Sequence, residues 1–285
     1  MNGESLSIVV PLYNEERRIP RLVEELAAHA RDDVRAAGLE LLEVIAVDDG
    51  STDSTAECSR AAGATFPALR TLADGTPNAG KGAAVARGVA WARGEWILVI
   101  DADLATPIDQ LSALTALVDS GVDLAVASRD QPGSIVVAAP RHRYVLGRAF
   151  NRMVRALTGL SLRDTQCGFK LLRSADAQRL TADQIVRRWA FDVELLMRAS
   201  HAGLKVAEAP VYYVHGEGST LHAWSVGPRM LLDVLRVTVA LGRSPSVWVT
   251  LRRRALRGRR RLQSAAAARA RSARPRDEAA RRAKQ

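Results

Sequence analysis

The sequence predicts an α/β fold, in which helices cover both faces of a doubly wound, mostly parallel sheet. Two observations predict it. Apolar, β-branched runs alternate with helical patterns at short spacing through residue 129, which is typical of parallel strands joined by helices. Three of the apolar runs stop abruptly at acidic residues, as strands do when they carry functional side chains to the carboxyl edge of such a sheet.

The expected elements of the first half follow one another closely. Residues 6–12 predict a strand, and the helix after it has Ile19, Leu22, Val23 and Leu26 on one face. The next expected elements are a strand over 41–47, a helix over 54–63, a helix over 83–93, a strand over 96–100, a helix over 108–120 and a strand over 123–127.

The alternation ends after residue 129. A glycine and two prolines make residues 131–140 an expected mobile loop, and residues 141–157 predict a helix with a basic face. Residues 164–172 predict a short strand or hairpin, and residues 188–196 begin another helix. A last strand is expected over 205–214, where Pro210 favours an edge position because proline cannot donate to a ladder.

The strand over 96–100 ends in Asp101-Ala102-Asp103. Along an extended chain, residues i and i+2 lie on the same side, so both carboxylates can face one hard cation, Mg²⁺ or Mn²⁺, while Ala102 points away. Taken alone, the pair also fits a cap of the helix that opens near Pro107.

Two further strand ends and one loop favour the metal interpretation. Carboxyl ends of neighbouring parallel strands share one crevice, so the acid-bearing ends should line a single cleft. Lys81 lies between two glycines, where the backbone can approach a diphosphate closely and the ammonium can meet its charge. The side chains expected in this cleft are Asn14, Glu15, Asp48, Asp49, Lys81, Asp101 and Asp103.

Four motifs, in this order and spacing, resemble the family 2 inverting glycosyltransferases of the GT-A fold: residues 9–15, residues 47–51, Gly80-Lys81-Gly82 and Asp101-Ala102-Asp103. Residues 164–170 and 188–196 resemble the branch that makes polyprenyl- or dolichyl-phosphate glucose. The resemblance covers roughly residues 5–225. It implies a GT-A domain over residues 1–225 that transfers a hexose, glucose from UDP-glucose, to a polyprenyl phosphate with inversion and with Mg²⁺ or Mn²⁺.

The same resemblance implies a role for each matching residue. Asp101 would lie by the ribose and the metal, Asp103 would ligate the metal, and Lys81 would meet the diphosphate. Cations for the acceptor phosphate would come from Arg129 and from Arg141 or Arg143. The remaining donor-binding positions are Pro11, Tyr13, Asn14 and Glu15 at the nucleoside, Asp48 or Asp49 at the base, and Ala102 between the two metal-site acids.

The nature of the acceptor decides whether a general base is needed. A departing diphosphate needs a metal and cations rather than a proton. A sugar hydroxyl as acceptor would need a base within hydrogen-bond reach. A phosphate monoester has a second pKa of about 6 and is already anionic, so arginine forks need only position it.

Asp192 carries this ambiguity. It can act as the base for a hydroxyl, or it can orient Arg188 or the sugar hydroxyls. Asp192 and Glu194 also fit the first turn of a helix, where acids favour the helix dipole. His215, after the last strand, is a further candidate for reaching the metal or the diphosphate. Transfer from GDP-mannose, or to a sugar hydroxyl, therefore stays open as an alternative.

The basic charge is concentrated at the carboxyl end. The chain of 285 residues has a net charge of +10, and residues 252–285 hold thirteen Arg and one Lys against two acids. Residues 226–251 predict a helix of mixed apolar and basic character. Together with the Arg-rich tail, this segment suits an anionic membrane surface. The other interpretation is a docked core helix followed by a solvated, disordered tail.

Several classes of protein are not expected. After Trp248 the tail has no aromatic side chains, which disfavours nucleic-acid binding. Cys58 and Cys167 match no disulfide framework, which suits a reducing cytoplasm. No signal-peptide pattern is seen, and no segment has the roughly 18 to 20 apolar residues needed to span a bilayer. The expected location is the cytoplasm, peripheral at the inner face of a membrane.

Overall fold

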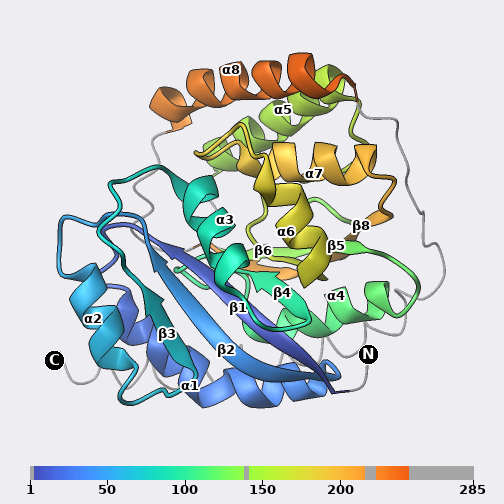
Figure 1. Ribbon diagram of the computed structural model, residues 1–285. Helices are drawn as coiled ribbons and strands as arrows, with labels where there is room; N and C mark the ends of the chain where they lie inside the picture. Colours follow the sequence, from blue (N-terminus) through green and yellow to red (C-terminus); the bar gives the residue numbers. More distant parts are fainter. Residues whose placement is uncertain (1–2, 138–140, 216–222, 244–285) are drawn as a thin grey trace, which may run out of the picture. The chain divides into compact units, whose positions relative to one another are not determined.

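A seven-stranded sheet forms the centre of the protein (Figure 1). The computed structural model describes residues 3–137, 141–215 and 223–243, without the side chains of 141–145 and 223–226. The strand order is β3-β2-β1-β4-β7-β5-β8. All neighbours are parallel except β7, which is antiparallel to β4 and β5. The strands are β1 Glu4–Leu12, β2 Leu39–Asp48, β3 Leu69–Leu72, β4 Trp96–Val99, β5 Leu124–Ser128, β7 Lys170–Arg173 and β8 Val206–Pro210. The predicted doubly wound sheet is confirmed.

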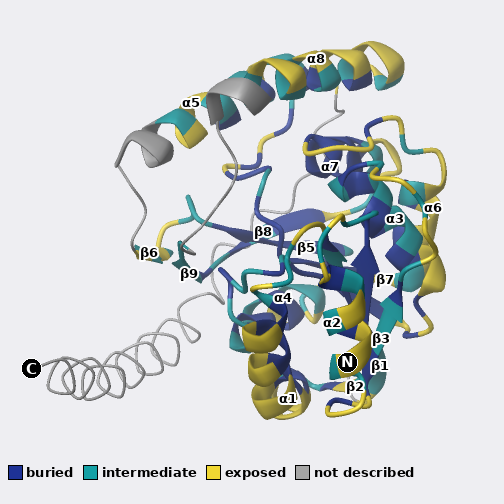
Figure 2. Cartoon of the chain, turned by 90° about the vertical axis from the view of Figure 1, so that its left-hand side faces the viewer, coloured by how far each residue is buried: buried dark blue, intermediate teal, exposed yellow. Residues whose placement is uncertain are grey.

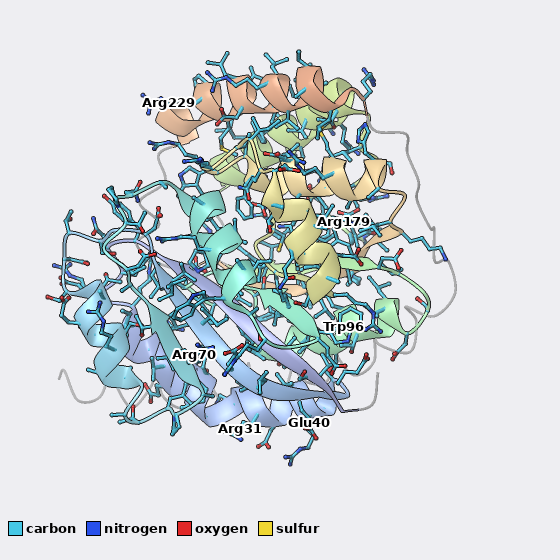
Figure 3. All side chains as sticks on the ribbon, in the orientation of Figure 1. Arg31, Glu40, Arg70, Trp96, Arg179 and Arg229 are labelled. Atoms are coloured by element: carbon cyan, nitrogen blue, oxygen red, sulfur yellow. The ribbon has the colours of Figure 1, made fainter. Side chains whose placement is uncertain are left out.

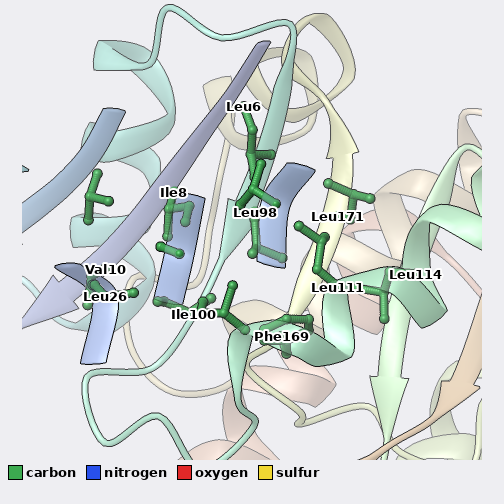
Figure 4. Close-up of a cluster of buried hydrophobic side chains, with 14 of the residues drawn as sticks. Leu6, Ile8, Val10, Leu26, Leu98, Ile100, Leu111, Leu114, Phe169 and Leu171 are labelled. Carbon is green, nitrogen blue, oxygen red and sulfur yellow. The ribbon is translucent and has the colours of Figure 1, made fainter. Parts of the chain in front are cut away.

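Helices cover both faces of this sheet. Alternate residues of β1 point to opposite sides, so Leu6, Ile8 and Val10 enter one apolar cluster while Val9 enters another. Figure 4 shows the first cluster, where the β1 side chains meet Leu26 and residues of β4. The helices are α1 Ile19–Ala36, α2 Thr55–Ala62, α3 Lys81–Trp91, the short 3-10 turn η1 Ile108–Gln110, α4 Leu111–Val118, α5 Arg141–Thr158, α6 Ser174–Ala182, α7 Phe191–His201 and α8 Ala223–Leu241.

The carboxyl ends of β1, β2 and β4 meet at one edge of the sheet. Leu12 pairs with Asp48 in register, and the amide of Asp49 donates to the Leu12 carbonyl at 2.9 Å. The amide of Ile100 donates to the Val9 carbonyl at 3.0 Å, which extends the β1–β4 ladder toward Asp101. The acids that end the three strands are therefore brought together by backbone pairing.

The last predicted strand is two strands. β8 lies at the sheet edge, as Pro210 indicates, but the chain leaves the sheet after it. β9 Tyr212–Val214 pairs instead with β6 Ile135–Val137 in a separate two-stranded sheet. The expectation of a loop throughout 131–140 is thus wrong for residues 135–137. Their β-branched side chains suit a strand, and the partner that pairs with them is far away in the sequence.

Helix α8 packs against α5 and α7, and Figures 1 and 2 both place α8 beside α5. Val234 and Val237 are fully buried there, so this part of the 226–251 segment is docked on the domain. The opposite side of α8 leaves Leu232 55% and Val239 86% exposed. The tail over 252–285 lies outside the described residues, and the domain boundaries stay predictions. Among the described helices, none is long and apolar enough to cross a bilayer.

Candidate active site

Asn14 ties the ends of β1 and β2 together. Its backbone lies in the left-handed region, at φ 55°, which asparagine tolerates better than most residues. Its amide donates to the Ser51 hydroxyl at 3.0 Å, and its side-chain oxygen accepts from the Thr52 amide at 2.8 Å. Tyr13 beside it is 45% exposed. Pro11 pairs with Val47, in the register position before the Leu12–Asp48 pair. These residues lie together at the carboxyl ends of β1 and β2.

Glu15 is held by a neighbouring cation. Its two carboxylate oxygens accept from Arg18 at 2.7 and 2.8 Å. Burial raises the pKa of Glu15, with Arg18 opposing that effect and Asp103 adding to it. The influence of Asp103 on this pKa indicates that the β1 and β4 ends share one electrostatic environment.

Asp48 and Asp49 have different surroundings. Both oxygens of Asp49 accept hydrogen bonds from the loop before α3, from the amides of Ala79 at 3.2 Å and Gly80 at 2.7 Å and from the Asn78 side chain at 3.0 Å. Asp48 accepts the Ser51 amide at 3.2 Å. Asp49 therefore holds the loop that carries Lys81, and Asp48 keeps more capacity for a ligand.

Lys81 opens α3 and points at Asp101. Its Nζ lies 2.5 Å from Asp101 Oδ1, and the rings of Trp189 and Phe191 lie 5.5 and 5.7 Å from it. Burial lowers the pKa of Lys81, but Asp101 and Asp192 outweigh burial and raise it above its ordinary value. Gly80 before it has φ 109°, and a Cβ there would lie 2.6 Å from the Arg187 carbonyl oxygen. The loop therefore requires glycine, and the ammonium stays charged.

Asp101 and Asp103 are close but differ in their partners. Burial raises the pKa of Asp101, yet Lys81 outweighs it and the pKa lies below its usual range. For Asp103, burial and then the charge of Asp101 raise the pKa. Ala102 between them is 8% exposed and packs in the apolar core, pointing away as predicted. Only its backbone can therefore meet a ligand.

The Asp101–Asp103 pair fits a divalent cation. Two like charges this close are unfavourable, and a hard cation on their oxygens would remove the repulsion that raises the pKa of Asp103. Asp103 Oδ1 accepts the Ala105 amide at 3.1 Å. Gly168 leaves room for the site, since a Cβ there would lie 2.5 Å from Asp101 Cγ.

The pair would supply two protein ligands to such an ion. In the described part of the chain, no three His, Cys, Asp or Glu side chains gather as a metal cluster. His215 follows β9, and its amide donates to the Val137 carbonyl at 2.9 Å; the structure does not bring it into a three-ligand set with the two acids. Oxygens of a bound diphosphate and water would complete the coordination of such an ion.

Asp192 lies in the first turn of α7 and is 3% exposed. Its carboxylate forms an ion pair with Lys170 of β7, which is 1% exposed. The ammonium of Lys170 also donates to the Cys167 carbonyl. Burial raises the pKa of Asp192, and Lys170 and Lys81 oppose that effect. The partner of Asp192 is therefore Lys170 and not Arg188, and the sequence argument did not name Lys170.

Glu194, the other acid of this turn, is a structural residue. It is fully buried and accepts the amides of Ile185 and Val186 at 2.6 to 3.0 Å. Arg198 Nε donates to the same carboxylate at 2.7 Å. These bonds fix the loop before α7, on which Trp189 approaches Lys81.

Arg129 follows β5 and is held by Asp164. Its Nε and Nη2 donate to the two oxygens of Asp164 at 2.7 and 2.9 Å, a bidentate geometry. Tyr213 lies under the guanidinium, with 5.3 Å between Cζ and the ring centre. Arg129 also contributes to the low pKa of Asp101, so its charge acts on the acid that ends β4. Arg141 begins α5, and its side chain, like that of Arg143, lies outside the described residues.

The Arg129–Asp164 pair predicts a pH dependence of stability. Burial raises the pKa of Asp164, but Arg129 outweighs it and lowers the pKa to about 2. The unfolded carboxyl keeps its ordinary value, so the stabilisation is present at neutral pH and is lost as pH falls toward the folded pKa. We expect the free energy of unfolding to fall by about 2 kcal/mol from this group between about pH 4 and pH 2.

Asp164→Asn tests this expectation by urea unfolding at several pH values. The variant should be less stable than wild type at neutral pH and should lack this part of the acid dependence. Equal slopes of stability against pH in the two proteins below about pH 4 would show that the pair contributes nothing.

Comparisons with known proteins place the chain in a family. The model of glycosyl transferase family 2 matches residues 7–181. A dolichyl-phosphate beta-glucosyltransferase of Dictyostelium discoideum is 31% identical over 239 residues, covering 81% of this chain and 73% of the relative. The protein of that name from Homo sapiens is 35% identical over 229 residues, covering 76% and 70%.

Solved structures share the fold. Glucosyl-3-phosphoglycerate synthase of Mycobacterium tuberculosis, in complex with Mn²⁺ and UDP-glucose, has a TM-score of 0.56 at 19% identity and covers 86% of this chain and 81% of its own. A mannosyltransferase of Pyrobaculum calidifontis, in complex with GDP-Man and Mn²⁺, has a TM-score of 0.59 at 22% identity, covering 86% and 67%. With the match to the family model and the identity to relatives of which it covers 70% or more, the chain belongs to glycosyl transferase family 2 and is a glycosyltransferase of the GT-A fold.

Proposed function

We propose that the protein transfers glucose from UDP-glucose to a polyprenyl phosphate of the dolichyl type, with inversion and with Mg²⁺ or Mn²⁺. The observation that carries the proposal is the state of Asp192, which is buried and paired with Lys170. A base held in this way suits an acceptor that needs no deprotonation. Similar proteins of 31 to 35% identity are named for transfer of glucose to dolichyl phosphate, which supports this acceptor.

On the donor side, Asp48 reads the base and Asp49 keeps the Lys81 loop in place. Pro11, Tyr13 and Asn14 flank the nucleoside at the rim of the cleft. Lys81 meets the diphosphate as a permanent cation and exchanges its pairing with Asp101 for phosphate oxygens. The likeness to structures that contain Mn²⁺ with a nucleotide sugar supports this arrangement.

Asp101 and Asp103 hold the metal in this proposal. When bound, the ion stabilises the negative charge that develops on the departing diphosphate. Asp101 has its charge balanced by Lys81, whereas Asp103 accepts a hydrogen bond from the Ala105 amide and forms no ion pair among the described residues. Asp103 is therefore the principal ligand, and Asp101 serves the ribose and the metal together.

On the acceptor side, Arg129 and Arg141 position the lipid phosphate. Its oxygen attacks the anomeric carbon from the face opposite the leaving diphosphate, which inverts the configuration. Asp164 fixes the guanidinium of Arg129 in one plane, and a phosphate dianion can approach the N–H groups that remain.

The direct test is turnover with defined substrates. Purified protein with UDP-glucose, Mg²⁺ or Mn²⁺ and a polyprenyl phosphate should release UDP and form a glucosylated lipid phosphate. GDP-mannose should give little product. Absence of product from UDP-glucose, with turnover from GDP-mannose or with a sugar acceptor, would replace this proposal by its alternative.

Asp192→Asn separates the two kinds of acceptor. With a phosphate acceptor we expect a moderate loss of rate, about tenfold, because the variant replaces the carboxylate that pairs with Lys170 by a neutral amide but removes no proton transfer. Loss of a general base would instead lower the rate by about 10² to 10⁴. The measurements are kcat with saturating donor and the Kd of UDP. Loss at the upper end of that range, with unchanged UDP binding, would identify Asp192 as a base for a hydroxyl acceptor.

We also propose that α8 brings the enzyme to an anionic membrane, at its cytoplasmic face. On its outer side, Leu232, Leu235 and Val239 are exposed beside Arg229 and Arg236. Such a helix lies in the interface between headgroups and acyl chains. The Arg-rich tail would add attraction to anionic lipids.

The double change Leu232→Gln and Val239→Gln tests this surface. We expect vesicle binding to weaken by about tenfold or more for each residue, since burial of such side chains is worth about 1.5 to 3 kcal/mol. The free energy of unfolding should change by less than about 0.5 kcal/mol per site. Leu42→Gln, at another exposed leucine, is the matched control. Equal vesicle binding in the double variant and the control would rule out this face.

A further inference from the structure

An arginine pocket lies outside the active-site cleft. It is a cavity of about 150 Å³ lined by Asp130, Arg148, Arg152, Arg155 and Arg163. Three of the arginines come from α5 at spacings of four and three residues, which places them on one face of the helix. The other two residues come from the turn after β5 and from the loop before Asp164. Two separate segments, α5 and the loop before Asp164, thus present cations to one small space, and a third supplies the acid Asp130.

The pocket has more positive charge than its own acid can balance. Asp130 is the one lining acid, and its Oδ1 lies 3.7 Å from Arg148 Nε. Arg163 Nη1 reaches the Asp130 carbonyl at 3.5 Å. Within the described residues, Arg152 and Arg155 have no ion-pair partner. Four guanidinium groups around one carboxylate leave an excess that favours an anion.

The size of the pocket limits which anion it takes. Sites for drug-sized ligands and cofactors have volumes of about 300 to 1,000 Å³, so a cavity of about 150 Å³ is too small for a nucleotide. A single phosphate group fits this size. Arginine is also the residue that best matches phosphate, because its planar fork donates two parallel hydrogen bonds.

The pocket is next to the acceptor side of the site but separate from it. Arg129 and Asp164 pair with each other and influence the cleft. Their chain neighbours Asp130 and Arg163 line the pocket instead. Carboxylate bonds fix this part of the backbone, because Glu208 accepts from the amides of Arg163 at 2.9 Å and Asp164 at 2.8 Å. The arginine pocket and the Arg129–Asp164 pair therefore use different side chains.

We infer that the arginine pocket binds a phosphate group other than those of donor and acceptor, supplied by the headgroup of an anionic phospholipid. A lipid is favoured over free phosphate because α5, which carries three of the arginines, packs beside α8, and α8 has exposed apolar side chains. Figure 2 colours much of the outer side of α8 as exposed. The same chemistry would accept inorganic phosphate, so the experiment separates the two sources.

The test compares two double variants of the full chain. Arg148→Gln with Arg152→Gln removes two charges from the pocket. Arg21→Gln with Arg31→Gln removes two charges from the exposed side of α1 and is the matched control; Arg31 is labelled in Figure 3. Both variants keep Arg129, so any phosphate bound at the acceptor site contributes equally to both. Circular dichroism and the Tm with UDP and Mn²⁺ establish that each is folded.

The probes are inorganic phosphate by calorimetric titration and sedimentation with phosphatidylcholine vesicles, with or without phosphatidylglycerol. We expect the pocket variant to bind phosphate at least about tenfold more weakly than the control. Its binding to the phosphatidylglycerol vesicles should weaken by about fivefold per arginine removed. Vesicles of phosphatidylcholine alone should not distinguish the variants.

The outcomes are distinct. Loss of both phosphate and anionic-vesicle binding supports the site and its lipid source. Loss of phosphate binding alone supports the site but overturns the lipid as its source. Equal behaviour of the two variants with both probes overturns the inference. Because these are binding measurements, they stand whether or not the proposed glucosyl transfer is observed.

Discussion

Replacing Asp103 with alanine is expected to lower the rate of sugar transfer by about 10³-fold, the scale seen when a preorganised stabiliser of developing charge is removed. Asp103 has one backbone hydrogen bond, to the Ala105 amide, and its pKa is raised by burial and by Asp101. Its free oxygen capacity is therefore available to a cation. UDP binding should fall much less, since the nucleoside contacts at Asn14 and Asp48 remain.

The measurements are product formation at saturating UDP-glucose and the Kd of UDP with Mn²⁺. Asp176→Ala is a matched control, because Asp176 is a partly exposed acid of α6 whose ion pair, within the part of the chain that the structure describes, is with Arg179 three residues on. Removal of divalent ions by a chelator should reduce wild type to the rate of Asp103→Ala and should leave that variant nearly unchanged. A variant that still responds fully to the chelator would place the metal elsewhere.

The sequence predicted that the acid-bearing strand ends meet at one edge of the sheet, for a physical reason. An apolar run that stops at acids is a local signal, and the pairing of neighbouring parallel strands brings such ends together. Asp48, Asp101 and Lys81 lie at that edge as expected. Likewise, the alternation of strands and helices is a local property, so the sheet and its helices were predictable.

What the sequence did not predict depends on long-range contacts. Lys170 stands in an apolar run, and a lysine within a buried strand needs a buried partner. That this partner is Asp192, 22 residues later, depends on the tertiary structure. Asp164 belongs to the motif over residues 164–170, but its pairing with Arg129, 35 residues earlier, cannot be deduced from spacing.

The errors in secondary structure have a related cause. β6 has three residues, and it pairs with β9, whose residues lie far along the chain at 212–214. The sequence of either strand by itself therefore does not reveal its partner. β3 and α6 are short elements with mixed polarity, and no expected element covered them. Short elements gain their stability from the neighbours on which they pack.

Two ion pairs, side by side, give the centre of the site its electrostatic character. Lys81 pairs with Asp101, and Lys170 pairs with Asp192. The pairs also influence each other, since Asp192 helps to raise the pKa of Lys81 and Lys170 helps to lower the pKa of Asp101. Removal of one lysine should therefore affect the other three charged groups. Lys170 is 1% exposed, so its removal should destabilise the protein more than removal of Lys81.

Lys170→Met is accordingly expected to destabilise the protein by about 3 to 5 kcal/mol, because it leaves Asp192 buried without its partner. The free energy of unfolding in urea, followed by tryptophan fluorescence, measures this loss. With Lys170 absent, the pKa of Asp192 should rise further. A carboxyl with a raised folded pKa binds its proton more readily when folded, so the destabilisation should shrink as pH falls.

The double variant Lys170→Met with Asp192→Asn isolates the pair from the packing of the methylene chain. With no charge left to bury, it should recover most of the stability lost by Lys170→Met, because replacing both members of a buried ion pair is far less harmful than removing one. If the double variant is as unstable as the single one at neutral pH, lost packing explains the effect. In that case the ion pair contributes little net stability, and the availability of Asp192 as a base for a sugar hydroxyl returns as the better explanation of the site.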